Sequence, residues 1–180
     1  GADRWYRSTD EGRSWRALPG TGASGDAITG LWVFDASRGL AATSGGRWLD
    51  TLNAGRDWTA RPDATRLPGS SQDLHFTPDG TGWVVALQKQ PVPLFGPAPS
   101  PAGPLYRSTD QGRSWSAVAL PAPAVGSVLG VQFVDDRHGV LRAATGCTSI
   151  RFHTCFEHSW ATSDGGANWQ STGAGLGGFI

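Results

Sequence analysis

The sequence is short of lysine, cysteine and methionine, and it carries no excess charge of either sign. Fifteen basic and fifteen acidic residues cancel over 180 residues, and Lys89 is the one lysine. Without a net positive field, nucleic acid and anionic membranes are not expected partners. No apolar run reaches the roughly 18 residues of a membrane span, and no charged-then-apolar leader opens the chain. Because the first residue is Gly and Met is absent, we expect a processed or trimmed piece.

Glycine, proline and tryptophan are abundant, with 26, 12 and 9 residues, a composition that favours short strands and many turns. Four eight-residue boxes align without gaps on the pattern Ser/Thr-x-Asp/Asn-x-Gly-x-x-Trp. They are residues 8–15 (STDEGRSW), 51–58 (TLNAGRDW), 108–115 (STDQGRSW) and 162–169 (TSDGGANW). A motif that returns every few tens of residues is typical of stacked repeat units.

The spacing around the boxes predicts the repeat unit. Each of the first three box Trp residues is followed, 18 or 19 residues later, by a Phe carried near the end of an apolar strand: Phe34, Phe76 and Phe133. A polar turn and a Gly then open a second apolar strand, as expected for a hairpin. Strands A and B of each unit are therefore this hairpin, strand C precedes the box, and strand D begins at its Trp. Four antiparallel strands in such a unit indicate a β-propeller blade.

The box residues are expected to fold a turn and to do no chemistry. The Asp or Asn can accept backbone hydrogen bonds, the Gly can take a positive φ, and the Trp can pack between neighbouring blades. Asn53 replaces the acid in the second box, which a general acid or nucleophile would not survive. The predicted structural residues are Ser8, Asp10, Gly12, Trp15, Thr51, Asn53, Gly55, Trp58, Ser108, Asp110, Gly112, Trp115, Thr162, Asp164, Gly166 and Trp169.

These boxes resemble the Asp-box, or bacterial neuraminidase repeat, of sialidases, sortilin-type receptors, xyloglucan-cleaving glycoside hydrolases and the photosystem II stability and assembly factor family. The stretch from VQFVDDRHGV to TSDGGANW is most similar to the last of these. The resemblance implies an all-β propeller of four-stranded antiparallel blades. It says little about activity, because the repeat occurs in enzymes and non-enzymes alike.

The sequence predicts about three and a half blades of a larger propeller within one domain. The half blade is expected at 1–20, followed by blades at 27–62, 72–120 and 127–172 and a tail at 173–180. The second and third blades carry insertions between strands B and C, at 88–104 and 145–158. Both insertions should rise from one face of the propeller.

A catalytic set is not found. Sialidases carry an Arg-Ile-Pro motif and a Tyr-Glu pair, but here the motif is missing and the only tyrosines, Tyr6 and Tyr106, lie beside boxes. A glycoside hydrolase needs two carboxylates across the mouth. The acids expected there are Asp26, Asp63, Asp73 and Glu157, for which solvated surface charge is the competing interpretation. His75 and His138 are expected to be strand or turn residues without a role.

The first insertion, 88–104, is rich in Pro, which predicts an extended, partly polyproline segment. Leu94 and Phe95 would be its apolar contacts with a partner. The alternative is a loop that binds nothing.

The second insertion, 145–158, holds both cysteines, Cys147 and Cys155. We expect a disulfide within the insertion, which implies an oxidising compartment. A zinc site with His153 and His158 is the alternative, although the spacing matches no familiar zinc motif. The candidate partner contacts on this insertion are Arg151, Phe152, His153 and Phe156, unless the two Phe rings pack back onto the blade.

The expected function is a non-catalytic scaffold, secreted, periplasmic or lumenal, that binds protein partners, as an assembly or stability factor would. No cofactor or metal is expected. A carbohydrate-active enzyme or lectin, with glycan as the ligand, is the second hypothesis. A structural subunit of a larger assembly is the third.

Overall fold

The structure is a computed structural model that describes residues 5–18, 26–68, 70–87, 105–121, 124, 128–148 and 154–176. These residues form 14 strands and no α-helix, and none of them belongs to a helix that could cross a membrane. The strands are β1 Trp5–Arg7, β2 Arg16–Leu18, β3 Ile28–Val33, β4 Gly39–Thr43, β5 Trp48–Thr51, β6 Thr59–Ala60, β7 Ser70–Phe76, β8 Gly82–Leu87, β9 Leu105–Ser108, β10 Ser116–Ala117, β11 Val128–Phe133, β12 Gly139–Thr148, β13 Thr154–Thr162 and β14 Gln170–Leu176.

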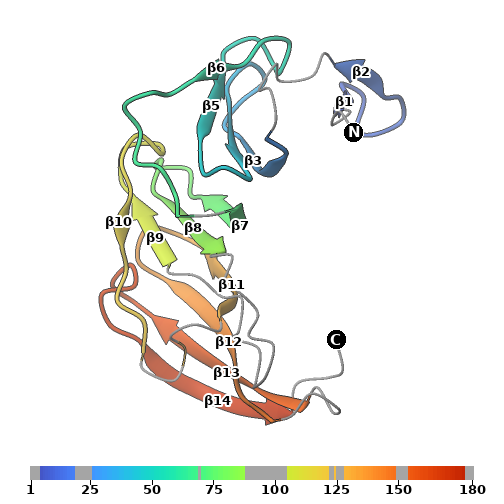
Figure 1. Cartoon of the computed structure of the whole chain (residues 1–180). Helices are drawn as coiled ribbons and strands as arrows, with labels where there is room; N and C mark the ends of the chain where they lie inside the picture. Colours follow the sequence, from blue (N-terminus) through green and yellow to red (C-terminus); the bar gives the residue numbers. More distant parts are fainter. Residues whose placement is uncertain are drawn as a thin grey trace, which may run out of the picture.

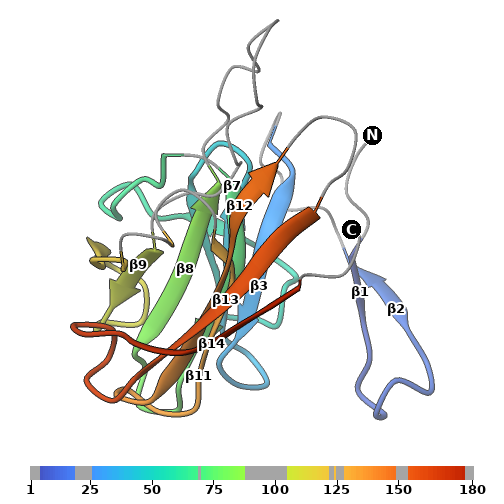
Figure 2. The same cartoon turned by 90° about the horizontal axis from the view of Figure 1, so that it is seen from below.

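The strands form one two-stranded and three four-stranded antiparallel sheets, each in chain order. The half blade is β1 and β2, the first blade β3 to β6, the second blade β7 to β10, and the third blade β11 to β14. This arrangement confirms the predicted all-β blades, with strands A to D in the predicted order. Figure 1 shows the sheets following one another along an arc, and Figure 2 shows the half blade at one end. The A strands β3, β7 and β11 are neighbours.

Alternation along strand B builds the core between neighbouring blades. In β8, Val84 belongs to a hydrophobic cluster between the first and second blades, together with Trp48 and Trp115. Its neighbours Trp83 and Val85 belong to a second cluster, between the second and third blades. Successive residues of a strand point to opposite faces, so each central strand joins two cores. The rings of Trp48 and Trp115 stack with centroids 4.9 Å apart.

The second core is built in the same way around Trp83 and Phe133, whose rings stack with centroids 3.7 Å apart. Aromatic faces of this size bury much of the apolar area available to so small a sheet. Each blade therefore depends on its neighbour for burial, as stacked repeats do.

The third blade differs from the prediction in its strand lengths. Strands β12 and β13 pair from Gly139 with Thr162 out to Thr148 with Thr154, so most of the region predicted as an insertion continues the sheet. The shorter B and C strands of the first blade, β4 and β5, show how far this hairpin is extended. Extra residues between strands B and C can either lengthen these two strands or form a loop. The sequence pattern does not distinguish the two outcomes.

Strand A ends at or next to its Phe in each complete blade, as predicted, but in the first blade it ends one residue earlier than in the others. Phe76 pairs with Gly82 and Phe133 with Gly139, but Val33 pairs with Gly39. Phe34 lies one residue further on, where its N–H donates to the Arg38 carbonyl in the turn. The 19-residue spacing in this unit was the sequence signal of the shift.

Candidate functional site

The four boxes fold the turns between strands C and D by side-chain hydrogen bonds. In the first box, the Ser8 Oγ donates to Asp10 Oδ1 at 2.8 Å and accepts from the Gly12 N–H at 2.7 Å. Asp10 accepts from the backbone N–H and the hydroxyl of Ser14. Equivalent bonds join Ser108 to Asp110 and Thr162 to Asp164. These contacts lie within each turn and join residues two to four positions apart.

The hydrogen bonds lower the pKa values of the box carboxyl groups. The pKa of Asp10 falls to about 2, mainly through the bonds from Ser14 and then from Ser8. The pKa of Asp164 falls to about 2 because the backbone and side chain of Asn168 donate to it. Burial raises the pKa of Asp110, but bonds from Ser114 and Ser108 outweigh it and lower the value to about 2.

In the second box the direction of one side-chain hydrogen bond is reversed. Asn53 Nδ2 donates to Asp57 Oδ2 at 2.7 Å, whereas in the other boxes the residue at the later position donates to the acid. Asn53 Oδ1 still accepts from the Asp57 N–H. Asn53 and Asp57 are therefore complementary as a pair.

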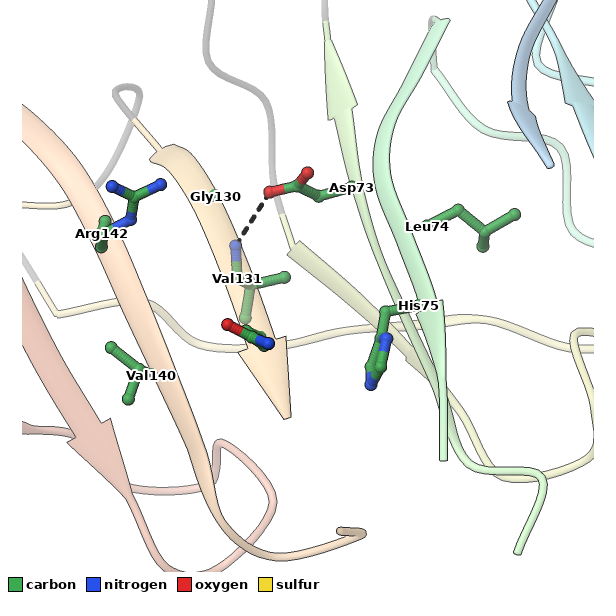
Figure 3. Close-up of a pocket in the computed structure, with 8 residues that line it drawn as sticks. Asp73, Leu74, His75, Gly130, Val131, Val140 and Arg142 are labelled. Carbon is green, nitrogen blue, oxygen red and sulfur yellow. Dashed lines mark hydrogen bonds between the residues drawn. The ribbon is translucent and has the colours of Figure 1, made fainter. Parts of the chain in front are cut away.

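A cleft of about 470 Å³ lies where the A strands of the second and third blades meet, and it is the candidate site. Figure 3 shows β7 on one side and β11 and β12 on the other. The lining residues are Asp73, Leu74, His75, Gly130, Val131, Gln132, Val140 and Arg142. The cleft lies on the inner strands of the arc and no box residue lines it, so the box turns and the candidate site are separate parts of the blade.

Asp73 is the distinctive residue of this cleft. By sheet register it occupies the position of Gly30 in the first blade and Gly130 in the third, and its own backbone has a φ of 51° at a β-bulge. A left-handed conformation costs a non-glycine residue roughly 1 kcal/mol, less for Asp than for most. Asp73 Oδ2 accepts from the Val131 N–H at 3.1 Å across the blade boundary.

Gly130 makes room for this carboxylate. A Cβ at Gly130 would lie 2.5 Å from Asp73 Oδ2, so a larger residue would displace the acid. His75 adds a second tie, with its Nε2 at 2.8 Å from the Phe133 carbonyl oxygen and its ring edge-on to Trp32. The side chains of β7 therefore fix the position of β11 while leaving a cleft beside it.

The opposite wall carries the positive charge. Arg142 is exposed and donates to Glu157 Oε1 at 3.2 Å. An exposed pair of this kind contributes little to stability, so the guanidinium can exchange partners at small cost. The cleft thus combines one carboxylate, one arginine, a histidine and an amide with the exposed side chain of Val140, whereas the side chains of Leu74 and Val131 pack into the cores between the blades.

Most of the partner contacts predicted on the two insertions cannot be compared with this cleft, because they lie outside the described residues. Leu94, Phe95, Arg151, Phe152 and His153 lie outside the described residues. Phe156 is described, lies in β13 opposite Thr145 and is 49% exposed.

The predicted disulfide also falls on side chains outside the described part. The backbone of Cys147 and Cys155 is described, however, and both lie in strands and not in a loop. Because Thr145 pairs with Phe156 and Thr148 with Thr154, Gly146 and Cys147 together face Cys155 across a bulge. His158, named for the alternative zinc site, stacks on Trp160, and the described residues hold no cluster of three or more potential metal ligands.

The acids predicted at the mouth separate in the structure. Asp26 pairs with Arg47 at 2.9 Å, Glu157 pairs with Arg142, and Asp63 lies in a hollow near Arg61 on the outer side of the first blade. Asp73 alone lines the cleft. His75, to which the sequence analysis gave no role, lines it too. One feature of the sequence could have identified the cleft: when the repeats are aligned, Asp73 stands where the other complete blades have Gly30 and Gly130.

No family model and no curated protein matches the chain. Among solved structures, the β-propeller fold has clear neighbours. YCF48 bound to D1 peptide gives a TM-score of 0.54 at 21% identity, over 86% of this chain and 40% of that one. YCF48 from Cyanidioschyzon merolae gives 0.52 at 12% identity, over 93% and 66%. The GH74 xyloglucanase from Xanthomonas campestris gives 0.58 at 19% identity, over 92% and 26%.

The fold is therefore that of a β-propeller segment. The neighbours are a photosystem II assembly factor and xyloglucanases, two of the groups that the boxes resemble. The chain spans 40% of the length of the first of them and 26% of the xyloglucanase, and the identities are low enough that the similarity concerns the fold alone.

Proposed function

We propose that this chain is a non-catalytic propeller scaffold that binds an extended segment of a partner protein in the cleft between β7 and β11. The observation that carries the proposal is Asp73, an acid in left-handed backbone at a position that is glycine in the other two complete blades. Local strain of this kind is concentrated at functional positions. Similarity to a propeller whose structure was solved with a bound peptide supports the same class of ligand.

The composition of the cleft suits a peptide. Strands β7 and β11 are each the innermost strand of their sheet, so the inner backbone edge of each pairs with no strand among the described residues. On β11 the Val131 N–H and the Phe133 carbonyl already bond to Asp73 and His75, so an extended peptide would pair with the edge of β7 through its main chain and place alternate side chains in the cleft. Val140, which is 45% exposed, offers apolar contact, while Asp73 and Arg142 can recognise opposite charges.

A glycosidase is less well supported. Hydrolysis of a glycosidic bond needs two carboxylates flanking it, about 5 to 9.5 Å apart. Asp73 is the one carboxylate among the residues that line the cleft, and one of its oxygens is already held by the Val131 N–H.

The test is selection of peptides from a displayed library against the intact chain, followed by binding measurements on variants. We expect Asp73→Asn and Arg142→Gln each to weaken selected peptides by about tenfold, as loss of a charged hydrogen bond does. Arg38→Gln, which breaks an equally exposed ion pair with Asp35 outside the cleft, is the matched control and should bind normally. Peptides that bind all variants equally, or a glycan array that yields the only ligands, would overturn the proposal.

We also propose that the protein acts outside the cytoplasm, with Cys147 and Cys155 joined. Their opposed positions on paired strands support this, since cross-strand neighbours are within reach of a disulfide. Intact mass after alkylation, with and without reductant, tests it. Resistance to alkylation until reduction is the expected result, and free alkylation of both thiols without reductant contradicts it.

A further inference from the structure

A hollow of about 300 Å³ lies on the outer side of the first junction, where the first and second blades meet. Its charged lining residues are Asp50, Arg61 and Asp63 of the first blade and Arg113 of the third box. Both blades have all four of their strands. The hollow therefore lies between two complete repeat units.

The second junction, between the second and third blades, has apolar residues at the same positions. Arg61 and Val118 are equivalent, because the N–H of each donates to the carbonyl of the first residue of strand C. Two residues further on, Asp63 corresponds to Leu120. Val118 and Leu120 pack against the hydrophobic core of the second junction, whereas the first junction has a hollow there. Local departures from the packing pattern of a fold are expected at functional sites.

The arginine that joins the two blades also comes from a different strand. At the second junction, Arg107 of strand C donates to the Asp136 carbonyl of the next blade at 3.2 Å. At the first junction the residue in place of Arg107 is Asp50. Arg61, just after strand D, donates from Nε to Asp50 and from Nη1 to the Gln111 carbonyl at 3.1 Å. Arg61 thus makes the contact with the next blade, and Asp50 neutralises its charge.

The other two charges of the hollow have no such partner. Asp63 and Arg113 are exposed, and neither side chain has a hydrogen-bond or ion-pair partner among the described residues. Their charges are opposite, and they belong to different blades. The remaining lining residues, Ala60, Pro62 and Ala64, are small and apolar. A concave place that combines apolar residues with a few polar groups is the usual form of a small-molecule site.

We propose that this hollow binds a small zwitterionic molecule of the amino acid or short-peptide class, whose carboxylate pairs with Arg113 and whose ammonium group pairs with Asp63. The charges of the four side chains cancel, which suits a ligand without net charge. Ion pairs with exposed groups are weak, so we expect a dissociation constant on the order of 1 mM. The site is separate from the cleft at Asp73 and does not rest on the function proposed for that cleft.

The test is a titration of the isotope-labelled intact chain followed by NMR. L-alanine and L-alanyl-L-alanine are the zwitterionic probes, and they differ in the separation of their two charges. N-acetyl-L-alanine lacks the ammonium group, and L-alaninamide lacks the carboxylate. We expect at least one zwitterion to shift the amide signals of residues 60–64 and Arg113 in a saturable way. Both singly charged compounds should bind about fivefold more weakly, because each loses one ion pair.

Variants locate the contact. Asp63→Asn and Arg113→Gln should each weaken the zwitterion about fivefold. Arg56→Gln is the matched control, because Arg56 holds the same position in the second box, is exposed and does not line the hollow. Asp50→Arg, Arg61→Val and Asp63→Leu together give the first junction the residues of the second. This triple variant should abolish binding without lowering the urea midpoint, since apolar packing replaces an ion pair.

Three results would overturn the proposal. The first is the absence of saturable shifts with both zwitterions. The second is equal binding of a singly charged compound, and the third is binding that survives both Asp63→Asn and Arg113→Gln.

Discussion

The first and third boxes are nearly the same sequence in two different surroundings. Residues 6–15 and 106–115 differ only at Glu11 and Gln111, and both fold the same turn, with φ values of 59° and 60° at these positions. In both, the Trp Nε1 donates to the carbonyl of the box Gly, at 3.0 and 3.2 Å. Yet Trp15 is 63% exposed and Trp115 is 5% exposed. The turn is thus determined locally, whereas burial is determined by the neighbouring blade.

The largest expected difference between the two boxes is in the energetic role of the Trp. Trp115→Ala should lower the free energy of unfolding by about 3 to 5 kcal/mol, because it removes a buried ring that stacks on Trp48. Trp15→Ala should cost less than about 1 kcal/mol, since the ring is exposed. Urea denaturation of both variants measures this, and equal losses would contradict the comparison.

The second-largest expected difference is in the cost of replacing the box glycines, Gly12 and Gly112, by alanine. Gly12 and Gly112 have φ values of 86° and 78°, so alanine costs roughly 1 kcal/mol at either position. At Gly112 the added Cβ would also lie 2.7 Å from Leu40 Cδ2, whereas at Gly12 its nearest neighbour is Trp15 at 3.7 Å. We expect Gly112→Ala to lose about 2 to 3 kcal/mol in total, because the first blade must move. Thermal unfolding of the two variants side by side checks the ranking.

The second box offers a way to break the shared pattern. Asn53→Asp should destabilise the protein by about 1 to 2 kcal/mol, because the new carboxylate would face Asp57 at hydrogen-bond distance. Adding Asp57→Ser recreates the acid–serine pair of the first and third boxes and should recover most of the loss. A double-mutant cycle by urea denaturation measures the coupling. Additive effects of the two changes would show that the residues do not act as a pair.

The smallest expected effect is on pH dependence, because the box acids are half-buried or exposed and solvent screens their interactions. The pKa values of Asp10, Asp110 and Asp164 are about 2 in the folded chain, against a usual value of 3.8. Between these values the unfolded chain binds more protons, so the stability that the acids contribute is complete above about pH 4 and is lost toward pH 2. Urea midpoints from pH 5 to 2 should fall less steeply for Asp110→Asn. An unchanged slope would argue against the hydrogen-bonded carboxylate.

Much of the fold could be predicted, because its determinants are local. The alternation around Trp83 to Ala86, the polar turns and the Ser, Asp and Gly of each box specify strands and turns within a few residues. The length of β12 and β13 could not be predicted. It depends on which residues meet across the sheet, and the residue pattern is the same whether the two strands continue or end in a loop.

The candidate site was predicted least well. Aromatic residues and Arg on the insertions were predicted as contacts from their residue types, whereas Asp73 was predicted only as one of four acids at the mouth and His75 only as a strand residue without a role. Their importance comes from the approach of β7 to β11, two strands more than 50 residues apart that lie side by side in the arc. Comparison of the aligned repeats, which places Asp73 with Gly30 and Gly130, was the information that could have led there.

By itself, the sequence determined the blade: hydrogen bonds between residues two to four positions apart define each box, and period-two alternation defines each strand. The tertiary structure decided which copies of the same motif are buried and where two inner strands leave a cleft. These properties depend on distances between blades, and identical local sequences such as residues 6–15 and 106–115 contain no information about what lies against them.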